Sequence, residues 1–323
     1  MDYKKKRFKT AGVLTAAAAT VTLIVPAVKS QDGSVIKIDG SSTVYPITKA
    51  VAEEYQIENQ GVAQVTVGVS GTGGGFKKFC SQDEAVRTDI SDASRPIKEE
   101  EMAMCEAAGV EYIEIPVAYD AITVVANPEN PIESMTVDEL NKIWSPESQD
   151  EITSWNQVNP EWPDAQFVLY SPGTDSGTFD GFTDKINGEE GASRTDHTPS
   201  EDDNVLVQSV SIASNALGYF GYSYYKENQD QLKAIAIDNG DGAVAPSVET
   251  VRDGSYQPLS RPIYIYVNAA AAERPEVAEF VNFYLINAEG LVSRVGSVPL
   301  TSEEYQEGIA KFQNGETGTT AAK

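Results

Sequence analysis

The chain has 323 residues and carries 49 acidic against 24 basic side chains, which gives a formal net charge of −25 at neutral pH. Nucleic acids and anionic membrane surfaces would repel so acidic a chain, so neither is expected as a partner. The length is more than one compact core usually needs, and it predicts two lobes with separate cores.

The first 30 residues have the pattern of an export signal. Basic residues crowd positions 4–9, an Ala- and Thr-rich apolar stretch follows over 11–28, and small residues precede Gln31. This pattern predicts cleavage after Ser30 and a periplasmic or secreted protein. A retained membrane anchor is the alternative, but Pro26 interrupts the stretch, and spanning a bilayer takes about 20 strongly apolar residues.

Strand and helix patterns alternate along the rest of the chain, which is typical of an α/β fold. Strands are expected at 35–38, 64–67, 110–115, 121–126, 166–170, 217–222, 232–237 and 263–267. Helices are expected at 46–58, 74–79, 97–108, 136–144, 177–186, 202–214, 275–286, 289–295 and 302–313. The small, polar tail 315–323 is expected to be disordered. No long linker interrupts the chain, so the lobes should share strands.

Three segments rich in serine, threonine and glycine, at 40–44, 68–75 and 175–179, each follow a predicted strand and precede a predicted helix. Glycines let a ligand approach the backbone, and the first N–H groups of a helix attract anions. One such segment alone is more often a plain loop. Three together at the carboxyl ends of strands predict an oxyanion cradle. The candidate hydroxyl donors are Ser42, Thr43, Ser70, Thr72, Ser176 and Thr178.

A fourth segment, 88–96, places Asp92 after a short predicted strand. A carboxylate repels an anion unless that anion brings a proton for it to accept. Hydrogenphosphate carries such a proton and sulfate does not, so Asp92 would favour phosphate. The alternative for Asp92 is an Asx turn or a helix cap before Pro96.

In their order along the chain, these segments resemble the phosphate-binding proteins of Pst-type ABC importers. The motifs are GSSTVYP at 40–46, the loop around Ser70, SDA at 91–93 and DSGT at 175–178. The resemblance covers essentially the whole chain after the signal segment. It implies phosphate contacts at Thr43, Val44, Ser70, Asp92, Ser176, Gly177 and Thr178.

The resemblance also implies an architecture and a role. Two α/β lobes, expected as residues 31–121 with 263–323 and residues 122–262, would be joined by crossing hinge strands with the ligand in the interlobe cleft. The protein would capture inorganic phosphate for an ABC permease in the membrane. It would be a monomer that uses no cofactor and is not an enzyme.

One departure from the family pattern concerns an arginine. Many members place it four residues before the serine of the fourth motif, where this chain has Pro172. Arg95 and Arg194 are the predicted substitutes, because a guanidinium can bind phosphate through two parallel hydrogen bonds. Each could instead form an ion pair with one of the many carboxylates. Arsenate, selenate or another tetrahedral oxyanion is therefore left open as the ligand.

Cys80 and Cys105 are the only cysteines of the chain. In an exported protein they predict a disulfide, and two buried thiols are the alternative. Together with the single imidazole, His197, they lack the ligand spacing of a zinc site.

The competing functional class is a secreted phosphomonoesterase that uses the same cradle. A serine nucleophile needs a base, and His197, in a polar loop, has no evident orienting partner. The acidic run 201–204 lacks the spacing of an EF-hand loop and predicts the first turn of a helix.

Overall fold

The computed structural model describes residues 34–59, 63–174 and 176–319. The predicted signal peptide, residues 1–30, and Asp175 of the fourth motif lie outside these residues. Residues 33–323 form one unit, and only its fold is described below. Across the described ranges, no helix is long and apolar enough to cross a membrane.

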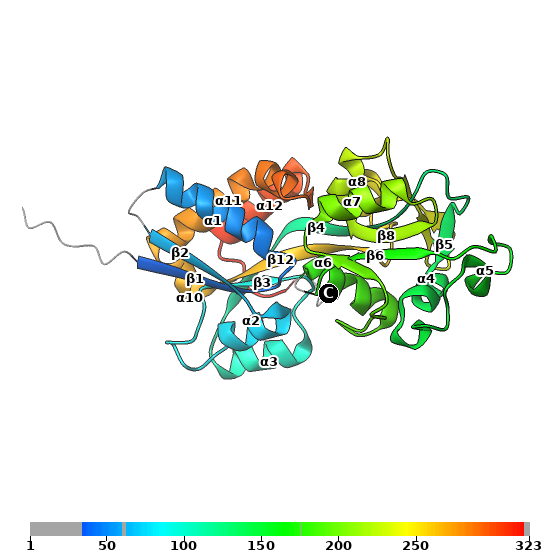
Figure 1. The fold of residues 1–323 in the computed structure, drawn as a ribbon. Helices are drawn as coiled ribbons and strands as arrows, with labels where there is room; N and C mark the ends of the chain where they lie inside the picture. The colour runs from blue at the N-terminus through cyan, green and yellow to red at the C-terminus, as the bar shows by residue number, and fades with distance from the viewer. Residues whose placement is uncertain (1–33, 60–62, 175, 320–323) are drawn as a thin grey trace, which may run out of the picture. The chain divides into compact units, whose positions relative to one another are not determined.

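The described chain alternates between strands and helices, as the sequence predicts (Figure 1). The strands are β1 (Ser34–Gly40), β2 (Ala63–Val69), β3 (Ile90–Ala93), β4 (Tyr112–Ala126), β5 (Ser134–Thr136), β6 (Val168–Pro172), β7 (Thr198–Ser200), β8 (Ala216–Gly221), β9 (Lys233–Ala234), β10 (Ala236–Asp238), β11 (Ala243–Val244), β12 (Ser260–Asn268) and β13 (Val298–Pro299). The helices are α1 (Tyr45–Glu58), α2 (Gly71–Phe79), α3 (Glu99–Ala107), α4 (Val137–Trp144), α5 (Trp155–Val158), α6 (Gly177–Phe182), α7 (Asp203–Ile212), α8 (Tyr222–Glu227), α9 (Val248–Arg252), α10 (Ala269–Ala272), α11 (Pro275–Arg294) and α12 (Ser302–Gln313). A 3₁₀ turn at Pro146–Ser148 and a π-helical turn at Thr183–Asn187 complete them.

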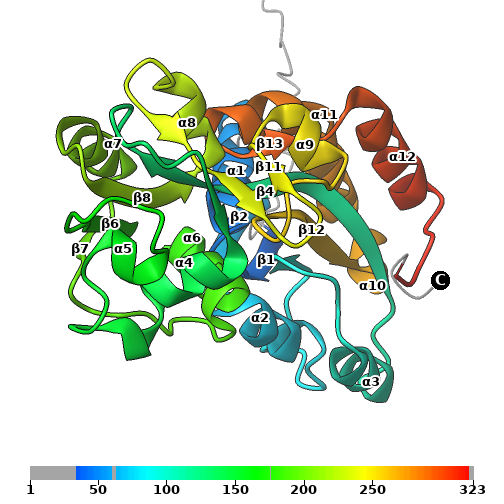
Figure 2. The same ribbon diagram turned by 90° about the vertical axis from the view of Figure 1, so that its right-hand side faces the viewer.

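The strands form a mixed sheet in the order β2-β1-β3-β12-β4-β8-β6-β7, with β9 and β13 also pairing with β4. β1 is parallel to β2 and β3, and β6 is parallel to β7 and β8. The antiparallel pair β4 and β12 lies between these two parallel groups, as Figure 1 shows. Figure 2 views the molecule from the end where α4 and α5 lie. A small sheet, β11-β10-β5, stands apart. The strand pairing therefore gives two lobes that share two long strands.

The two strands expected at 110–115 and 121–126 are one continuous strand, β4. Pro116 lies inside it, opposite Tyr264 of β12, where the register shifts between Ile263 and Tyr264. A proline cannot donate a ladder hydrogen bond, and a bulge accommodates it at that point. The strand therefore passes from one lobe into the other without a turn.

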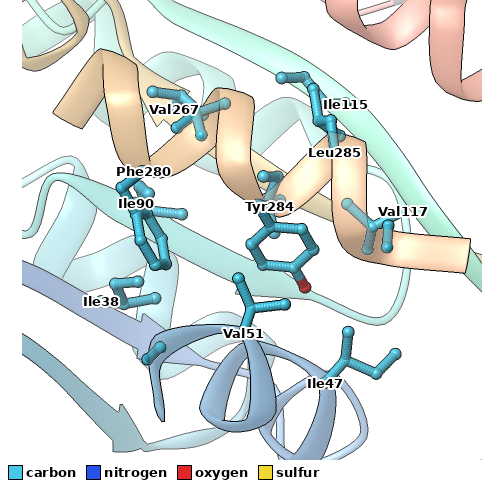
Figure 3. Close-up of a cluster of buried hydrophobic side chains, with 14 of the residues drawn as sticks. Ile38, Ile47, Val51, Ile90, Ile115, Val117, Val267, Phe280, Tyr284 and Leu285 are labelled. Atoms are coloured by element: carbon cyan, nitrogen blue, oxygen red, sulfur yellow. The ribbon is translucent and has the colours of Figure 1, made fainter. Parts of the chain in front are cut away.

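Each lobe has its own buried apolar cluster. In the first lobe, α1 and α11 pack on the sheet, with Ile38, Val51, Ile115, Phe280 and Leu285 among the buried side chains (Figure 3). α2 and α3 cover the opposite face of the same sheet (Figure 1).

The second lobe is built around aromatic contacts. Phe182 stacks on Tyr219 with ring centroids 3.8 Å apart, and Trp144 meets both rings edge-on. Trp144 is fully buried, as the sequence pattern around Leu140 and Ile143 indicates.

Helix α11 merges two helices that the sequence pattern keeps apart, 275–286 and 289–295. Its apolar stripe continues through Ala288, Leu291 and Val292, which are all buried. Because the buried stripe is unbroken, the polar residues between the two patterns stay in the same helix.

The expectation of a disordered tail is wrong for residues 315–319. The Gly318 N–H donates to the Tyr112 carbonyl at 2.8 Å, and Gly318 forms a bridge with Ile113 of β4. The predicted disulfide is confirmed, because Cys80 and Cys105 are bonded. It ties the end of α2 to α3.

Candidate anion-binding cleft

The predicted hydroxyl residues lie at strand ends that converge. β1, β2 and β3 end at Gly40, Val69 and Ala93, and α1 and α2 are the elements that follow the first two, beginning at Tyr45 and Gly71. In the second lobe, Ser176 caps α6, since its Oγ accepts a hydrogen bond from Thr178 N at 3.2 Å. α2 begins at Gly71, three residues before the predicted start, so Ser70 stands at its N-cap position. The orphan N–H groups of α2 and α6 are thus available to an anion.

Most of the predicted donors line one cleft. A cavity of about 830 Å³ is bordered by Ser42, Thr43, Ser70, Ser176, Gly177 and Thr178. An adjoining cavity of about 500 Å³ shares Ser42, Thr43 and Ser70 and adds Thr72 and Arg95. Three predicted residues line neither cavity: Val44, Asp92 and Arg194.

The two lobes touch between these cavities. Thr43 Oγ1 donates to the Gly177 carbonyl at 3.3 Å, and Ser42 Oγ donates to Asp180 Oδ2 at 3.4 Å. A Cβ on Gly177 would lie 2.5 Å from Thr43 N and 2.7 Å from its Oγ1. Only a glycine permits this approach, so donors from both lobes face the same small space.

Asp92 lies beneath the first motif and is fully buried. Its carbonyl accepts from Ser41 N at 3.0 Å, and a Cβ on Gly40 would lie 2.1 Å from that carbonyl oxygen. Gly40, with φ of +148°, is therefore required for this contact. Asp92 thus sits in the wall that holds the first motif and not on the cavity surface.

The Asp92 carboxyl has one satisfied oxygen and one that is not. Oδ1 accepts from Thr48 Oγ1 at 3.0 Å, and the Thr48 hydroxyl lies 3.1 Å from that of Tyr284. Oδ2 is buried and has no hydrogen-bond partner among the described residues. Burial raises the pKa of Asp92 to about 8, with Thr48 lowering it and Asp39 raising it further. Such a carboxyl needs a proton or a donor from outside the protein.

Ser70 has a partner that sequence reasoning missed. Its Oγ donates to Asp39 Oδ1, while Lys78 Nζ lies 2.6 Å from Asp39 Oδ2. Asp39 directly precedes the first motif, but the sequence offers no sign that Lys78, 39 residues further along the chain, forms an ion pair with it. The pair fixes the Ser70 side chain at the rim of the cleft.

Both predicted substitute arginines are held by carboxylates. Arg95 makes two hydrogen bonds to Glu101, at 2.8 and 2.7 Å. Arg194 is 2% exposed and binds Asp196 at 2.6 and 2.7 Å as well as the carbonyls of Ile143 and Ile152.

The two arginines differ in their position relative to the cleft. The hydrogen bonds from Arg194 lower the pKa of Asp196 to about 2. The Arg194 guanidinium is therefore fully used inside the second lobe, away from the cleft lining, which departs from the expectation. Arg95 lines the smaller cavity, but both terminal nitrogens of its guanidinium are hydrogen-bonded to Glu101.

A different arginine, Arg261, reaches the cleft. It lies on β12 opposite Asp120 of β4, and its Nε is 3.4 Å from Asp120 Oδ2. Arg261 lines the smaller cavity and Asp120 the larger one. The predicted strand began at Ile263, and no motif marks Arg261, so only the pairing of the two hinge strands reveals it.

The charges around the two cavities differ in sign. Carboxylates border the larger one: Asp120, Asp180, Glu190, Glu201 and Asp203. Burial, with Asp202 and Glu201 adding to it, raises the pKa of Asp203 to about 6. The smaller one is bordered by four basic side chains, Arg95, Lys98, Lys185 and Arg261, and by three carboxylates, Asp180, Asp184 and Glu190. Within the described residues no group of acidic, His or Cys side chains has the arrangement of a metal site.

His197 does not line either cavity. It packs 5.9 Å from Trp144, between ring centroids, and burial lowers its pKa. Ser176 therefore has no imidazole beside it in the cleft lining.

The fold and the cleft define the class of two-lobed binding proteins whose lobes share crossing strands. A family model described as a PBP superfamily domain matches residues 25–288. The chain belongs to the Pst-type phosphate-binding proteins of that superfamily.

Its relatives support this membership. Protein SphX from Synechocystis sp. is 52% identical over 90% of this chain and 85% of its own length. Phosphate-binding protein PstS from Staphylococcus saprophyticus is 36% identical over 86% of this chain and 84% of its own length.

Solved structures agree with the fold. The crystal structure titled as a possible phosphate binding protein from Planctomyces limnophilus has a TM-score of 0.82 at 44% identity, covering 88% of this chain and 99% of that one. An ABC-type phosphate transport receptor from Vibrio cholerae has a TM-score of 0.64 at 23% identity, covering 82% and 100%, which shows a common fold.

Proposed function

We propose that this protein captures inorganic phosphate outside the cytoplasm and delivers it to an ABC permease in the membrane. Relatives named as phosphate-binding proteins, at 36% identity over most of the chain, support the role. The observation that carries it is the buried Asp92 carboxyl, whose Oδ2 has no partner among the described residues, in a residue whose backbone carbonyl binds Ser41 of the donor-rich first motif.

The proposed site binds through aimed donors and not through net charge. N–H groups at the starts of α2 and α6 and the hydroxyls of Thr43, Ser70 and Ser176 would replace the hydration shell of the anion. Asp92 lines neither cavity in this structure. A shift of the first motif on binding would bring its carboxyl to the ligand, and the two would then share one proton. Sulfate brings no proton to an ionised Asp92, so it leaves a buried charge unpaired.

The proposed motion is a closing of the two lobes about β4 and β12. The expected lobe boundaries, at 121/122 and 262/263, fall inside these strands. Closure would bring the α6 N–H groups onto an anion held by the first lobe, and a single chain contains both walls, consistent with a monomer. No cofactor takes part.

Calorimetric titration with phosphate and with sulfate at pH 8 tests the proposal. Phosphate should bind with one site per chain, and sulfate at least about 100-fold more weakly. Asp92→Asn should reduce this ratio more than it disturbs folding. Equal binding of both anions, or binding of neither, would refute the proposal, and an unchanged ratio in Asp92→Asn would remove the proton-sharing role.

The same preparation tests the two alternatives. Release of phosphate from a phosphomonoester by the purified chain would support a phosphomonoesterase, although the only imidazole of the chain, His197, lies outside the cleft lining that contains Ser176. Tighter binding of arsenate or selenate than of phosphate would reassign the ligand.

A further inference from the structure

Pro172 stands where the family motif of the resemblance has an arginine, so a guanidinium for the phosphate site proposed above would come from elsewhere in this chain. Pro172 is buried at the end of β6 and offers no donor. Arg194 is used by Asp196 and two carbonyls, and the fork of Arg95 is filled by Glu101. A cation close by would stabilise an anion bound in a chain of net charge −25, in addition to the aimed donors.

Arg261 lines the cleft, and unlike Arg95 it makes no pair of short hydrogen bonds to a carboxylate among the described residues. It borders the smaller cavity together with Ser42, Thr43 and Ser70. Its side chain is 18% exposed, so a charge pair made there is only weakly screened. The donors of the first lobe and this guanidinium thus border one space, and Ser176 and Thr178 border the adjoining larger cavity.

Its resting contact is weak. Within the described residues, Arg261 makes a single ion pair, at 3.4 Å from Asp120 Oδ2. Good charge-assisted hydrogen bonds are about 2.7–2.9 Å long, as those of Arg95 and Arg194 are. The Arg261 guanidinium therefore keeps N–H groups that its partner does not bind, whereas those of Arg95 and Arg194 each make two short hydrogen bonds to one carboxylate.

Helix α6 is shaped to admit the guanidinium. A Cβ on Gly181 would lie 2.8 Å from Arg261 Nη2 and 3.3 Å from Ile122 Cδ1. Gly181 is in the helix whose start carries Ser176, Gly177 and Thr178. The absence of a side chain at 181 lets Arg261 lie against the same short helix that presents the anion donors.

We propose that Arg261, from the hinge strand β12, is the phosphate-binding arginine of this protein, with Asp120 as the partner it leaves when the anion binds. The inference rests on the proposed phosphate site, and it adds to that site a phosphate-contacting residue that lies outside the four sequence motifs. Because Arg261 lies on a strand shared by both lobes, the anion would also bind to the hinge itself.

Calorimetry with phosphate on the full chain tests this assignment. Arg261→Gln should raise the dissociation constant by about 30-fold or more, since it removes charge-assisted hydrogen bonds. Asp120→Asn should bind phosphate as tightly as the wild type or more tightly, because it frees the guanidinium. Gly181→Ala should weaken binding several-fold while leaving the charge unchanged. Arg274→Gln, which breaks the distant ion pair with Asp89, should have no effect.

Arg261→Gln is expected to weaken phosphate binding and Asp120→Asn is not. This difference distinguishes a binding role of Arg261 from a purely structural one. If Arg261 only braces the hinge, Arg261→Gln and Asp120→Asn should lower the unfolding temperature and the affinity alike, and that result would overturn the assignment. Wild-type affinity in a folded Arg261→Gln protein would overturn it too, while the phosphate function would stand. Failure of the wild type to bind phosphate would refute the function and the assignment together.

Discussion

Asp92 combines a functional position with an unfavourable environment. Its carboxyl is fully buried, and one oxygen has no partner within the described residues. Burial raises the pKa of Asp92 from 3.8 to about 8 in the folded protein. The folded state therefore holds a proton that the unfolded state releases once the pH exceeds about 4.

The first prediction concerns the pH dependence of stability. Because the folded pKa of Asp92 is the higher one, its ionisation in the unfolded chain lowers the free energy of unfolding progressively from about pH 4 to pH 8. Asp92→Asn removes this penalty. The variant should be no more stable than the wild type below pH 4 and more stable by a margin that grows up to pH 8.

Urea unfolding of the phosphate-free protein at several pH values measures this margin. Asp241→Asn, at an exposed loop position, is the control and should show no such growth. A stability difference that stays constant between pH 4 and pH 8 would mean that Asp92 is not held protonated by burial.

The site residues divide by how far their partners lie along the chain. Thr43, Ser70, Ser176 and Thr178 could be predicted from sequence because hydroxyl and glycine motifs at strand ends are local signals. The pairs that complete the site are not local. Asp120 and Arg261 are register partners on β4 and β12, and Asp39 meets Lys78 across the end of β1 and the body of α2. Local patterns in a single sequence do not reveal which distant strands pair.

At the scale of elements, the junction of the two lobes depends on Gly177. The second prediction is that Gly177→Ala weakens phosphate binding by about tenfold or more, because a Cβ there would meet Thr43 N at 2.5 Å and hold the lobes apart. The measurement is calorimetry together with thermal unfolding.

Gly290→Ala is the matched control, since Gly290 lies inside α11 with open space around it. It should leave affinity unchanged and stabilise the helix by about 0.5–1 kcal/mol. Wild-type affinity in Gly177→Ala would show that the lobes do not close at this contact.

The disulfide between α2 and α3 gives the third prediction. It closes a loop of 25 residues, which in the chain-entropy view stabilises the fold by about 3 kcal/mol. Replacing Cys80 and Cys105 by serine should lower the free energy of unfolding by about 2–4 kcal/mol in guanidinium chloride.

Phosphate affinity of the same variant should change little, because the cysteines do not line the cleft. A loss of binding in a folded double variant would mean that the disulfide positions the Ser70 loop, which α2 follows.

Element boundaries were predictable where local signals end them and not where tertiary packing extends them. α1 and α4 begin within a residue of their predicted starts, at Tyr45 and Val137, where the expected ranges begin at 46 and 136. β4 runs on through Pro116 because β12 and a bulge accommodate it, and α11 runs on because its buried stripe is continuous. Both extensions depend on neighbours that a sequence window does not contain.

At the scale of the whole molecule, the net charge opposes the ligand. With 49 acidic and 24 basic residues, the chain repels phosphate at long range, and salt screens this repulsion over about 8–10 Å. The fourth prediction is that the association rate of phosphate rises, or stays level, as sodium chloride increases from about 20 to 200 mM.

Stopped-flow mixing of phosphate with the protein, followed by tryptophan fluorescence, measures this rate. Electrostatic steering by the basic side chains around the smaller cavity would give the opposite trend. A rate that falls steeply with salt would show that their local field outweighs the net charge of the molecule.

The central claim is that one phosphate lies between Thr43, Ser70 and Ser176 and shares a proton with Asp92. A crystal structure of the full chain grown with phosphate at pH 8 tests it most directly. The account predicts a tetrahedral anion within hydrogen-bond distance of these hydroxyls, of the N–H groups that begin α6 and of Asp92 Oδ2. An anion bound elsewhere, or one in this cleft with no contact to Asp92, would contradict it.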